Sequence, residues 1–248
     1  NIPYECRNGG CGVCKCTVLA GKVDPGLYQP NALSPEELAQ GKVLACCATA
    51  LEDCEIEYDA SAVRTNIKEY TASVVDMTKL THDVMRVTLK LPNKDRIPFK
   101  AGQYINIILD DGQRRAFSFA NPPHFGDIIE LQIRLMPGGK FTTHVFEAMK
   151  EGDEVRFEGP IGDFTLRESE RPIVFVAGAT GFAPVKSMVE DAFQRGLKRE
   201  IHLYWGVKTL KDLYLPELPA RWAREHANFH FIPVLSEPTP EDQWSGRT

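Results

Sequence analysis

The sequence predicts a multidomain chain of α+β and α/β type, built from three consecutive regions. All seven cysteines fall within residues 1–62, a region that glycines interrupt and that contains one capped helical turn. After a linker at 63–69, residues 70–169 contain short strand-like segments between turns, typical of a small antiparallel barrel. Residues 170–248 alternate apolar strands with amphipathic helices, which favours a partial α/β domain with a parallel sheet.

Composition restricts the class of partner. The chain has 248 residues, a net charge of -5 and 43% hydrophobic residues, which supply ordinary cores. A negative net charge argues against a nucleic-acid or anionic membrane surface. No apolar stretch approaches the roughly 20 residues that span a bilayer, and the first residues lack the pattern of a signal peptide. We therefore expect a cytoplasmic protein, and an odd number of clustered cysteines indicates metal ligation rather than disulfides.

The first region offers a strand and a helix. Residues 16–23, CTVLAGKV, are a strand candidate. In SPEELAQG, Ser34 is suited to cap a helix, Pro35 to occupy its first turn and Glu37 to complete a capping box, and Gly41 ends the turn.

The second and third regions divide into segments by their hydrophobic period. The six strands expected in the second region are residues 71–78, 83–91, 103–109, 114–120, 128–136 and 153–160, with a helix at 142–150. In the third region we expect a strand at 172–179, a helix at 180–196, a strand at 200–207, a helix at 217–226 and a strand at 228–236. The run PIVFVAGA is apolar throughout, which predicts a strand buried on both faces, and EIHLYWGV is expected to be a second buried strand.

Cysteine spacing indicates an iron–sulfur centre. Cys6, Cys11 and Cys14 have the C-x4-C-x2-C spacing of plant-type 2Fe-2S clusters, and glycines in RNGGCGVC allow the backbone to wrap closely around a cluster. A structural zinc site is the alternative, although it usually pairs two short C-x2-C hooks. The fourth ligand is Cys46 or Cys47. We choose Cys46, which continues the apolar run KVLAC, and expect Cys47 and the other two cysteines to be ordinary thiols.

The segment RRAFSFA resembles the Arg-x-Tyr-Ser strand of the ferredoxin reductase superfamily. Arg115, Phe117 and Ser118 occupy the motif positions, with phenylalanine in place of tyrosine. The resemblance implies that Arg115 pairs with the pyrophosphate of FAD. It also implies that Phe117 packs against the flavin ring and that Ser118 lies near the nitrogen that accepts hydride. The missing tyrosine hydroxyl puts a contact with the flavin's sugar chain in doubt.

A second phosphate segment follows in PGGKFTTHVF. A glycine pair before a helix is by itself more often a simple loop, but its order after the Arg-x-Phe-Ser strand matches the superfamily. The resemblance implies pyrophosphate contacts through the backbone amides of Lys140, Phe141 and Thr142 at a helix N-terminus.

The turn VAGATGFAPVKS resembles the superfamily's Gly-x-Thr-Gly-x-x-Pro version of a nucleotide-binding turn. It implies that Gly178, Thr180 and Gly181 admit a nicotinamide dinucleotide and that Pro184 lies at the start of the next helix. Lysines and an aspartate in WGVKTLKDLYL leave the choice between NADH and NADPH open, with a preference for NADH.

The order of the regions resembles the reductase components that feed oxygenases and the iron–sulfur reductase of deoxysugar biosynthesis. This implies a β-grasp 2Fe-2S module, an FAD-binding barrel and a partial Rossmann-like NAD(P)-binding domain. Hydride would pass from NADH to FAD near Ser118, Phe117 and Thr180, and single electrons would pass through the cluster to a partner oxygenase or dehydratase. The resemblance to these reductases also leads us to expect that the chain is the middle part of a longer reductase.

Two other functions fit the same motifs. The first is an electron carrier that binds a cluster and flavin but performs no nicotinamide chemistry. The second is a zinc-bound interaction domain. None of the six histidines has a ligand or triad spacing in the sequence, so we expect them to be surface or packing residues.

Overall fold

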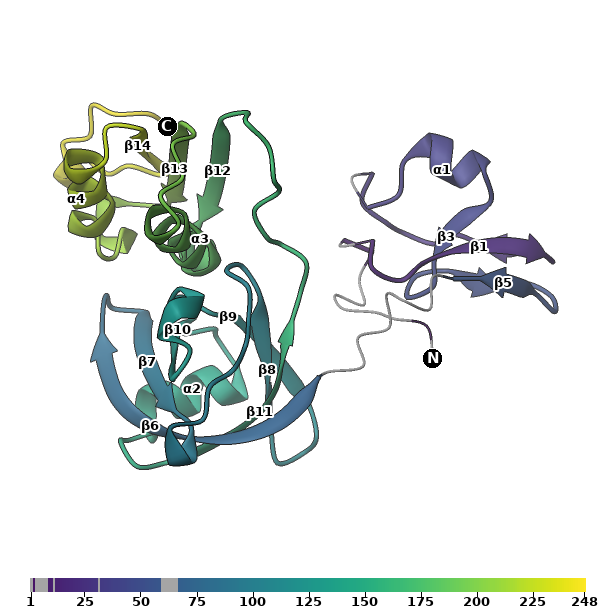
Figure 1. Cartoon of the computed structure of the whole chain (residues 1–248), viewed down its shortest axis with the longest axis horizontal. Coiled ribbons are helices and arrows are strands. Elements are labelled where there is room, and N and C mark those ends of the chain that lie inside the picture. The colour runs from purple at the N-terminus through teal and green to yellow at the C-terminus, as the bar shows by residue number, and fades with distance from the viewer. Residues whose placement is uncertain (1, 3–8, 11, 31, 59–66) are drawn as a thin grey trace. The chain divides into compact units, whose positions relative to one another are not determined.

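The computed structural model describes residues 2, 9–10, 12–30, 32–58 and 67–248. The chain divides into two compact units, Asn1–Ile67 and Lys68–Thr248, shown in Figure 1.

The described residues of the first unit form two small antiparallel sheets and one short helix. The three-stranded sheet has the order β3-β1-β5, and a two-stranded sheet pairs β2 with β4. The elements are β1 (Lys15–Ala20), β2 (Val23–Asp24), α1 (Pro35–Ala39), β3 (Lys42–Leu44), β4 (Thr49–Ala50) and β5 (Glu55–Glu57). The predicted capping box is confirmed, because Ser34 Oγ accepts from Glu37 N at 3.2 Å and Glu37 Oε2 accepts from Ser34 N at 3.1 Å.

The strand predicted over residues 16–23 is divided in the structure. β1 ends at Ala20, and β2 begins only at Val23 and joins the other sheet. Gly21 lies between them with φ at +89°, and a Cβ there would lie 2.4 Å from the Asp53 carbonyl oxygen. The apolar pattern continues on both sides of Gly21, so it predicted one strand where the backbone makes a turn that requires glycine.

The second unit begins with a six-stranded antiparallel sheet that confirms all six predicted strands. Its order is β10-β7-β6-β11-β8-β9. The strands are β6 (Lys68–Lys79), β7 (Val84–Lys90), β8 (Tyr104–Ile108), β9 (Arg114–Ser118), β10 (Ile128–Arg134) and β11 (Glu154–Ile161). A backbone hydrogen bond from Ala120 N to Glu130 O, 2.8 Å long, links the segment after β9 to β10 at the other end of the order. Helix α2 (Lys140–Glu147) buries Phe141 and Val145 in this core. We call these elements the antiparallel domain.

One glycine of the antiparallel domain gives a prediction about stability. Gly102 has φ at +97°, and a Cβ there would lie 1.8 Å from the Phe164 carbonyl oxygen. Gly112 has φ at +76°, but a Cβ there meets nothing within 4 Å. Gly112→Ala should therefore cost only the left-handed backbone term, about 1–2 kcal/mol of unfolding free energy. Gly102→Ala should cost about 1–3 kcal/mol more, because backbone must also move.

Urea unfolding of the two alanine variants beside the parent protein measures this difference. Gly112→Ala is the matched control for the backbone term. Equal losses in the two variants would show that the contact with Phe164 carries no cost.

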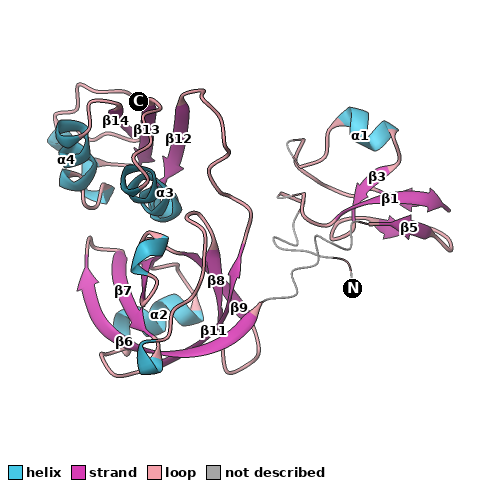
Figure 2. Cartoon of the chain, in the orientation of Figure 1, coloured by secondary structure: helices cyan, strands magenta, loops and turns pink. Residues whose placement is uncertain are grey.

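A parallel three-stranded sheet follows, with helices between its strands (Figure 2). The elements are β12 (Ile173–Gly178), α3 (Phe182–Gln194), β13 (Ile201–Val207), α4 (Glu217–Glu225) and β14 (Phe229–Leu235), in the sheet order β12-β13-β14. All five predicted elements are confirmed, within three residues at each end. We call them the parallel domain.

The prediction that β12 is buried on both faces is wrong for the part of the chain that the structure describes. Ile173, Phe175 and Ala177 are buried, whereas Val174 and Val176 are 61% and 81% exposed. The buried face packs with Phe182 of α3, whose ring stacks on Trp205 with centroids 3.9 Å apart. Among the described elements, α3 and α4 both pack in the hydrophobic core on the buried face of β12. An apolar run alone therefore did not predict whether one or both faces of the strand are covered.

A buried lysine links the parallel domain to the antiparallel domain. Lys186 of α3 is only 7% exposed, and its Nζ donates to the Ala120 carbonyl oxygen at 3.1 Å. The same ammonium group pairs with Glu130 of β10 at 3.4 Å and with Glu190, one helical turn later, at 3.1 Å. A buried cation paired with two carboxylates and a carbonyl has its charge and donors satisfied, and such a group is costly to separate from its partners.

Two further hydrogen bonds cross the same boundary. Ser187 Oγ donates to the Asn121 carbonyl oxygen at 2.8 Å. Tyr214 OH, almost fully buried, donates to Gln132 Oε1 at 2.8 Å. Burial raises the pKa of the Tyr214 phenol far above its usual range, with smaller contributions from nearby carboxylates, so it remains a donor at neutral pH. The two domains are therefore held together by buried polar contacts.

The carboxyl of Glu190 predicts a pH dependence of stability. Burial raises its pKa, opposed in part by Lys186. The folded state therefore holds this proton more tightly than the unfolded state, whose pKa is about 4.3. Stability should fall as pH rises from about 4.3 through the raised folded value. Glu190→Gln removes this dependence, and Lys186 keeps Glu130 as its partner.

The measurement is the unfolding free energy of parent and Glu190→Gln from about pH 4 to about pH 7. The difference between the two proteins should shift in favour of the variant as pH rises. Other carboxylates titrate in both proteins and cancel in that difference. A difference that does not change with pH would contradict the role of Glu190.

Candidate functional site

The cysteine site lies in the first unit. Cys6 and Cys11 lie outside the described residues, so the structure gives no geometry for them. Cys14 is 2% exposed, and the Cys46 amide donates to Cys14 Sγ at 3.5 Å. Both residues belong to a hydrophobic cluster with Leu33 and Leu44. Two of the four predicted ligands are thus in contact although 32 positions separate them.

Cys46 and Cys47 lie in different surroundings. Their sulfur atoms are 3.6 Å apart. A Cβ added at Gly9, whose φ is +74°, would lie 2.9 Å from Cys47 Sγ and 2.8 Å from the Leu27 carbonyl oxygen. Cys47 therefore packs on the Gly9 turn, while Cys46 packs beside Cys14. Cys46 stays our predicted fourth ligand, with Cys47 as its rival.

The remaining described cysteines have other environments. Burial raises the pKa of the Cys16 thiol, which disfavours the thiolate that ligates metals. Cys54 Sγ donates to the Lys22 and Glu52 carbonyl oxygens at 3.3 and 3.1 Å. No disulfide joins the cysteines within the described ranges. Thiolate donors on a glycine-rich loop fit an iron–sulfur cluster, since Gly12 also has a positive φ of +77°.

The predicted flavin strand is β9, next to α2. Arg115 is exposed, and its guanidinium donates to Gln113 Oε1 at 2.6 Å and to the Arg114 carbonyl oxygen at 2.9 Å. The Phe117 ring is 5.4 Å from the Phe141 ring, centroid to centroid. Ser118 pairs in register with Tyr104 of β8. The structure therefore brings the Arg-x-Phe-Ser strand and the glycine-pair segment together, as their order in the superfamily motif implies.

The N-terminus of α2 fits an anion. Its N-cap is Gly139, and no side chain caps the helix. Lys140 Nζ lies 3.1 Å from Asp111 Oδ2, so its charge is paired at the surface. The Thr142 hydroxyl accepts from Met136 N at 3.1 Å and lies 3.2 Å from the Gly139 carbonyl oxygen. The Thr142 hydroxyl therefore stabilises the loop before α2. An anion would be bound by the backbone amides of Lys140, Phe141 and Thr142, as predicted from the sequence.

The glycine turn after β12 borders a cavity of about 230 Å³ at the carboxyl ends of the parallel strands. Gly178, Gly206, Lys208, Val234 and Ser236 line it from the parallel domain. In open α/β sheets this edge is where ligands bind. Thr180, Gly181 and Pro184 lie in the 3-10 turn and the first turn of α3 that follow.

Two glycines of the turn leave room for a ligand. Gly178 and Gly181 have ordinary φ values of -107° and -59°, and a Cβ at either position meets nothing within 4 Å. Neither the backbone conformation nor packing within the chain requires glycine at these two positions. The absence of a side chain therefore leaves open space beside the backbone. Ala179 between them has φ at +46°, and its carbonyl oxygen accepts from Trp205 Nε1 at 3.0 Å. These observations fit a dinucleotide close to the backbone.

Sequence reasoning missed the residues that the antiparallel domain contributes to this cavity. Asp83, Val84 and Arg134 line it as well. Arg134 Nε donates to Asp83 Oδ2 at 2.6 Å. Burial acts to raise the pKa of Asp83, but the hydrogen bond and charge of Arg134 outweigh it and lower that pKa. The two residues are 51 positions apart and share no motif, so only the fold could reveal them.

Three sequence families match consecutive parts of the chain. Residues 1–51 match the 2Fe-2S iron-sulfur cluster binding domain, residues 71–166 the oxidoreductase FAD-binding domain, and residues 175–248 the oxidoreductase NAD-binding domain. These families in this order define an NAD(P)H-dependent oxidoreductase that uses a 2Fe-2S cluster, FAD and a nicotinamide dinucleotide.

Curated relatives align along nearly the whole chain. The CDP-6-deoxy-L-threo-D-glycero-4-hexulose-3-dehydrase reductase of Yersinia pestis is 37% identical over 250 residues, covering 100% of this chain and 74% of the relative. The reductase component 2 of terephthalate 1,2-dioxygenase from Comamonas is 38% identical, covering 99% and 74%. The chain belongs to the ferredoxin reductase superfamily, among the reductases that combine 2Fe-2S, FAD-binding and NAD-binding domains.

A solved structure is similar over the same range. The Amycolatopsis cytochrome P450 reductase has a TM-score of 0.74 and 38% identity, covering 97% of this chain and 74% of that one. The predicted three-domain fold and its cofactors are thus confirmed, and so is the role in electron transfer to a partner protein. Each helix in the described ranges is too short or too polar to span a lipid bilayer.

Proposed function

We propose that this chain is the electron-supplying component of a cytoplasmic oxygenase or deoxysugar dehydratase system. NADH is the donor, and the acceptor is the oxygenase or dehydratase protein. The observation that carries this proposal is the cavity at the carboxyl ends of the parallel strands. Both domains border it, with Gly178 on one side and Arg134 on the other. A donor nucleotide bound there would lie against the domain that carries the flavin motif.

The chemistry of the cofactors sets what the protein must provide. When bound, FAD takes a hydride from the nicotinamide and gives up electrons one at a time, which suits the one-electron 2Fe-2S cluster. The chain itself performs no bond-breaking step. It binds the groups, orients them, excludes water and tunes the charge around them.

The flavin is assigned to the face formed by β9 and α2. Arg115 would exchange its contact with Gln113 for a charge-assisted hydrogen bond to phosphate, since its planar fork matches phosphate oxygens. The backbone amides of Lys140, Phe141 and Thr142 would bind the same pyrophosphate. Phe117 would pack on the flavin ring and exclude water, and Ser118 would orient the edge that accepts hydride. The first turn of α2, whose amides no side chain caps, and the exposed guanidinium of Arg115 support this assignment.

The nicotinamide dinucleotide is assigned to the turn after β12. Gly178 and Gly181 would admit the pyrophosphate, Thr180 would approach the nicotinamide, and Pro184 shapes the first turn of α3. NADH is preferred to NADPH because Lys208 is paired with Glu237 at 3.1 Å. Asp212 Oδ2 accepts hydrogen bonds from the Thr209 hydroxyl and the Thr209 amide at 2.8 and 2.9 Å. Because this carboxylate caps its own turn, it does not decide between NADH and NADPH.

The cluster is assigned to Cys6, Cys11, Cys14 and Cys46. Buried Cys14 and its contact with the Cys46 amide support this set, because amide donors to sulfur stabilise the charge of ligated thiolates. The two cysteines outside the described residues are assigned on their spacing alone.

An absorbance spectrum before and after anaerobic addition of NADH tests the proposed function. We expect flavin peaks with an iron–sulfur shoulder, both bleached by NADH. Flavin and cluster bands that NADH leaves unchanged would favour the electron carrier instead. A colourless protein containing zinc would contradict both functions. Repeating the addition with NADPH at equal concentration tests the preference for NADH.

A further inference from the structure

Three side chains outside the cofactor sites meet on the parallel sheet. Glu200 immediately precedes β13, His202 is the second residue of β13, and His230 is the second residue of β14. β13 and β14 are parallel, and the register pairs His202 with His230. Their neighbours Ile201 and Phe229 are buried in the core with α3 and α4, so the histidines lie on the opposite face. Glu200, two residues before His202, shares that face.

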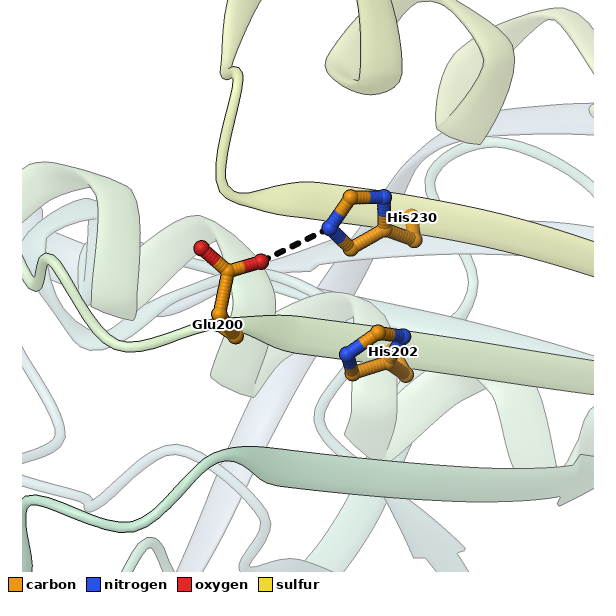
Figure 3. A group of neighbouring side chains, drawn as sticks. All are labelled: Glu200, His202 and His230. Atoms are coloured by element: carbon orange, nitrogen blue, oxygen red, sulfur yellow. Dashed lines mark hydrogen bonds and ion pairs between the residues drawn. The ribbon is translucent and has the colours of Figure 1, made fainter.

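Figure 3 shows the three side chains grouped on one face of the sheet, with a contact drawn between His230 and Glu200 and with His202 next to His230. His230 Nε2 lies 2.7 Å from Glu200 Oε2. The two imidazole rings are stacked, with centroids 4.6 Å apart and planes 20° apart. One ligand atom from each residue falls within 4.8 Å of the other two. Around one zinc ion with bonds of about 2.0–2.1 Å the ligand atoms lie about 3.3 Å apart, so binding requires the side chains to rotate closer together.

We propose that Glu200, His202 and His230 form a binding site for a divalent transition-metal ion of the zinc type. Two imidazole nitrogens and one carboxylate oxygen are a donor set that zinc accepts, with a fourth position left for water. The ion would replace the hydrogen bond between His230 and Glu200 and would join β13 to β14. This inference is independent of the proposed electron transfer.

The backbone under the site is held by hydrogen bonds, so binding costs little reorganisation. Ile201 N donates to the Asn228 carbonyl oxygen at 2.8 Å, and Asn228 Nδ2 donates to the Arg199 carbonyl oxygen at 2.7 Å. These bonds fix the segments that enter β13 and β14 beside each other. Ile173 N donates to the Glu200 carbonyl oxygen at 2.7 Å and ties the same segment to β12. Ligands on supported strand ends form a more exact site than ligands on loops.

The neighbouring positive charge is directed elsewhere. Arg199 Nε donates to the Arg171 carbonyl oxygen at 2.6 Å, and its Nη1 donates to the Arg167 carbonyl oxygen at 3.0 Å. Glu200 therefore keeps its carboxylate for His230, or for an ion in its place. His230 and Glu200 have side chains 45% and 52% exposed, so an ion has direct access from solvent.

The location assigns the ion a structural role. The three ligands lie at the amino ends of β13 and β14, whereas the nucleotide cavity is lined at the carboxyl ends by Gly206 and Val234. β14 lies at one edge of the sheet order, and an ion would attach it to the central strand. Zinc should therefore raise the stability of the parallel domain without entering the path of hydride transfer.

The test measures zinc directly on protein loaded with FAD and cluster. The protein is dialysed to equilibrium against ZnCl2, and zinc and iron per chain are determined by elemental analysis. Four forms are compared: the parent, His230→Asn, Glu200→Gln and His124→Asn. His124 is an exposed histidine on another segment and serves as the matched control. The parent and the control should hold one more zinc per chain than the other two, with equal iron in all four.

Thermal unfolding with and without zinc gives a second readout. Zinc should raise the Tm of the parent and of His124→Asn, and leave the Tm of His230→Asn and Glu200→Gln unchanged. The Tm of each variant in EDTA shows that it is folded, and His202→Asn repeats the test at the third ligand. Equal zinc in all forms, or zinc uptake matched by loss of iron, would overturn the proposal, because either result places the metal elsewhere.

Discussion

Cys14→Ser should abolish electron transfer to a one-electron protein acceptor while leaving the flavin reaction in place. A serine hydroxyl does not replace a buried thiolate ligand, so the cluster bands and the cluster iron should be lost. Reduction of cytochrome c should fall by more than the roughly 10–100-fold that changes around metal ligands cost. Ferricyanide accepts electrons directly from the flavin, so its reduction by NADH should remain. Iron content, the visible spectrum and the two activities are measured on the same preparation.

Matched controls decide whether the loss belongs to ligation. Cys16 is equally buried, so Cys16→Ser controls for the substitution itself and should retain iron. Cys46→Ser should lose iron as Cys14→Ser does, whereas Cys47→Ser should retain it. The reverse result would make Cys47 the fourth ligand. An equal fall of both activities in Cys14→Ser, with flavin retained, would contradict electron flow from flavin to cluster.

Arg115→Ala should weaken FAD binding more than any other single change on β9. A hydrogen bond involving a charged group contributes about 1.5–3 kcal/mol, which corresponds to roughly a 10- to 150-fold rise in Kd. The Arg115 guanidinium donates to Gln113 Oε1 and to the Arg114 carbonyl oxygen, and a phosphate can replace both acceptors. FAD is titrated into flavin-free protein, and the Kd is obtained from flavin fluorescence.

The adjacent arginine is the control for this prediction. Arg114 Nε pairs with Glu158 of β11 at 2.8 Å, and strand alternation directs its side chain to the other face. Arg114→Ala should leave the Kd for FAD within about threefold of the parent. If Arg114→Ala weakens FAD binding as much as Arg115→Ala, the flavin phosphate is not bound by the side chain of Arg115.

Local signals predicted most of the fold because they act within a few residues. The capping box at Ser34 and the six strands of the antiparallel domain follow from caps, turns and side-chain alternation, and the structure confirms them. The break at Gly21 was missed because apolar letters continue on both sides of the turn. The exposure of Val176 was missed because a strand's own residues do not encode what covers its second face.

The candidate site was predicted only where motifs carry it. Cysteine spacing and the Arg-x-Phe-Ser strand are readable from neighbouring positions. Arg134 at the nucleotide cavity and Lys186 at the domain boundary have partners 51 and 56–66 positions away. No local pattern links such positions, and the register that joins His202 to His230 is equally a property of the folded sheet.

The buried contacts of Lys186, Ser187 and Tyr214 limit how the molecule can be divided or recombined. A parallel domain taken from a related reductase would bring its own residues to these positions, facing the Glu130 and Gln132 of this chain. Wherever the partners failed to match, a buried charge or donor would be left unsatisfied, at a cost of about 1–3 kcal/mol or more for each group. Exchange of nucleotide specificity between relatives should therefore succeed only when both sides of the boundary are transferred as one set. The antiparallel and parallel domains have separate sheets, but in protein engineering they should be exchanged together as one unit.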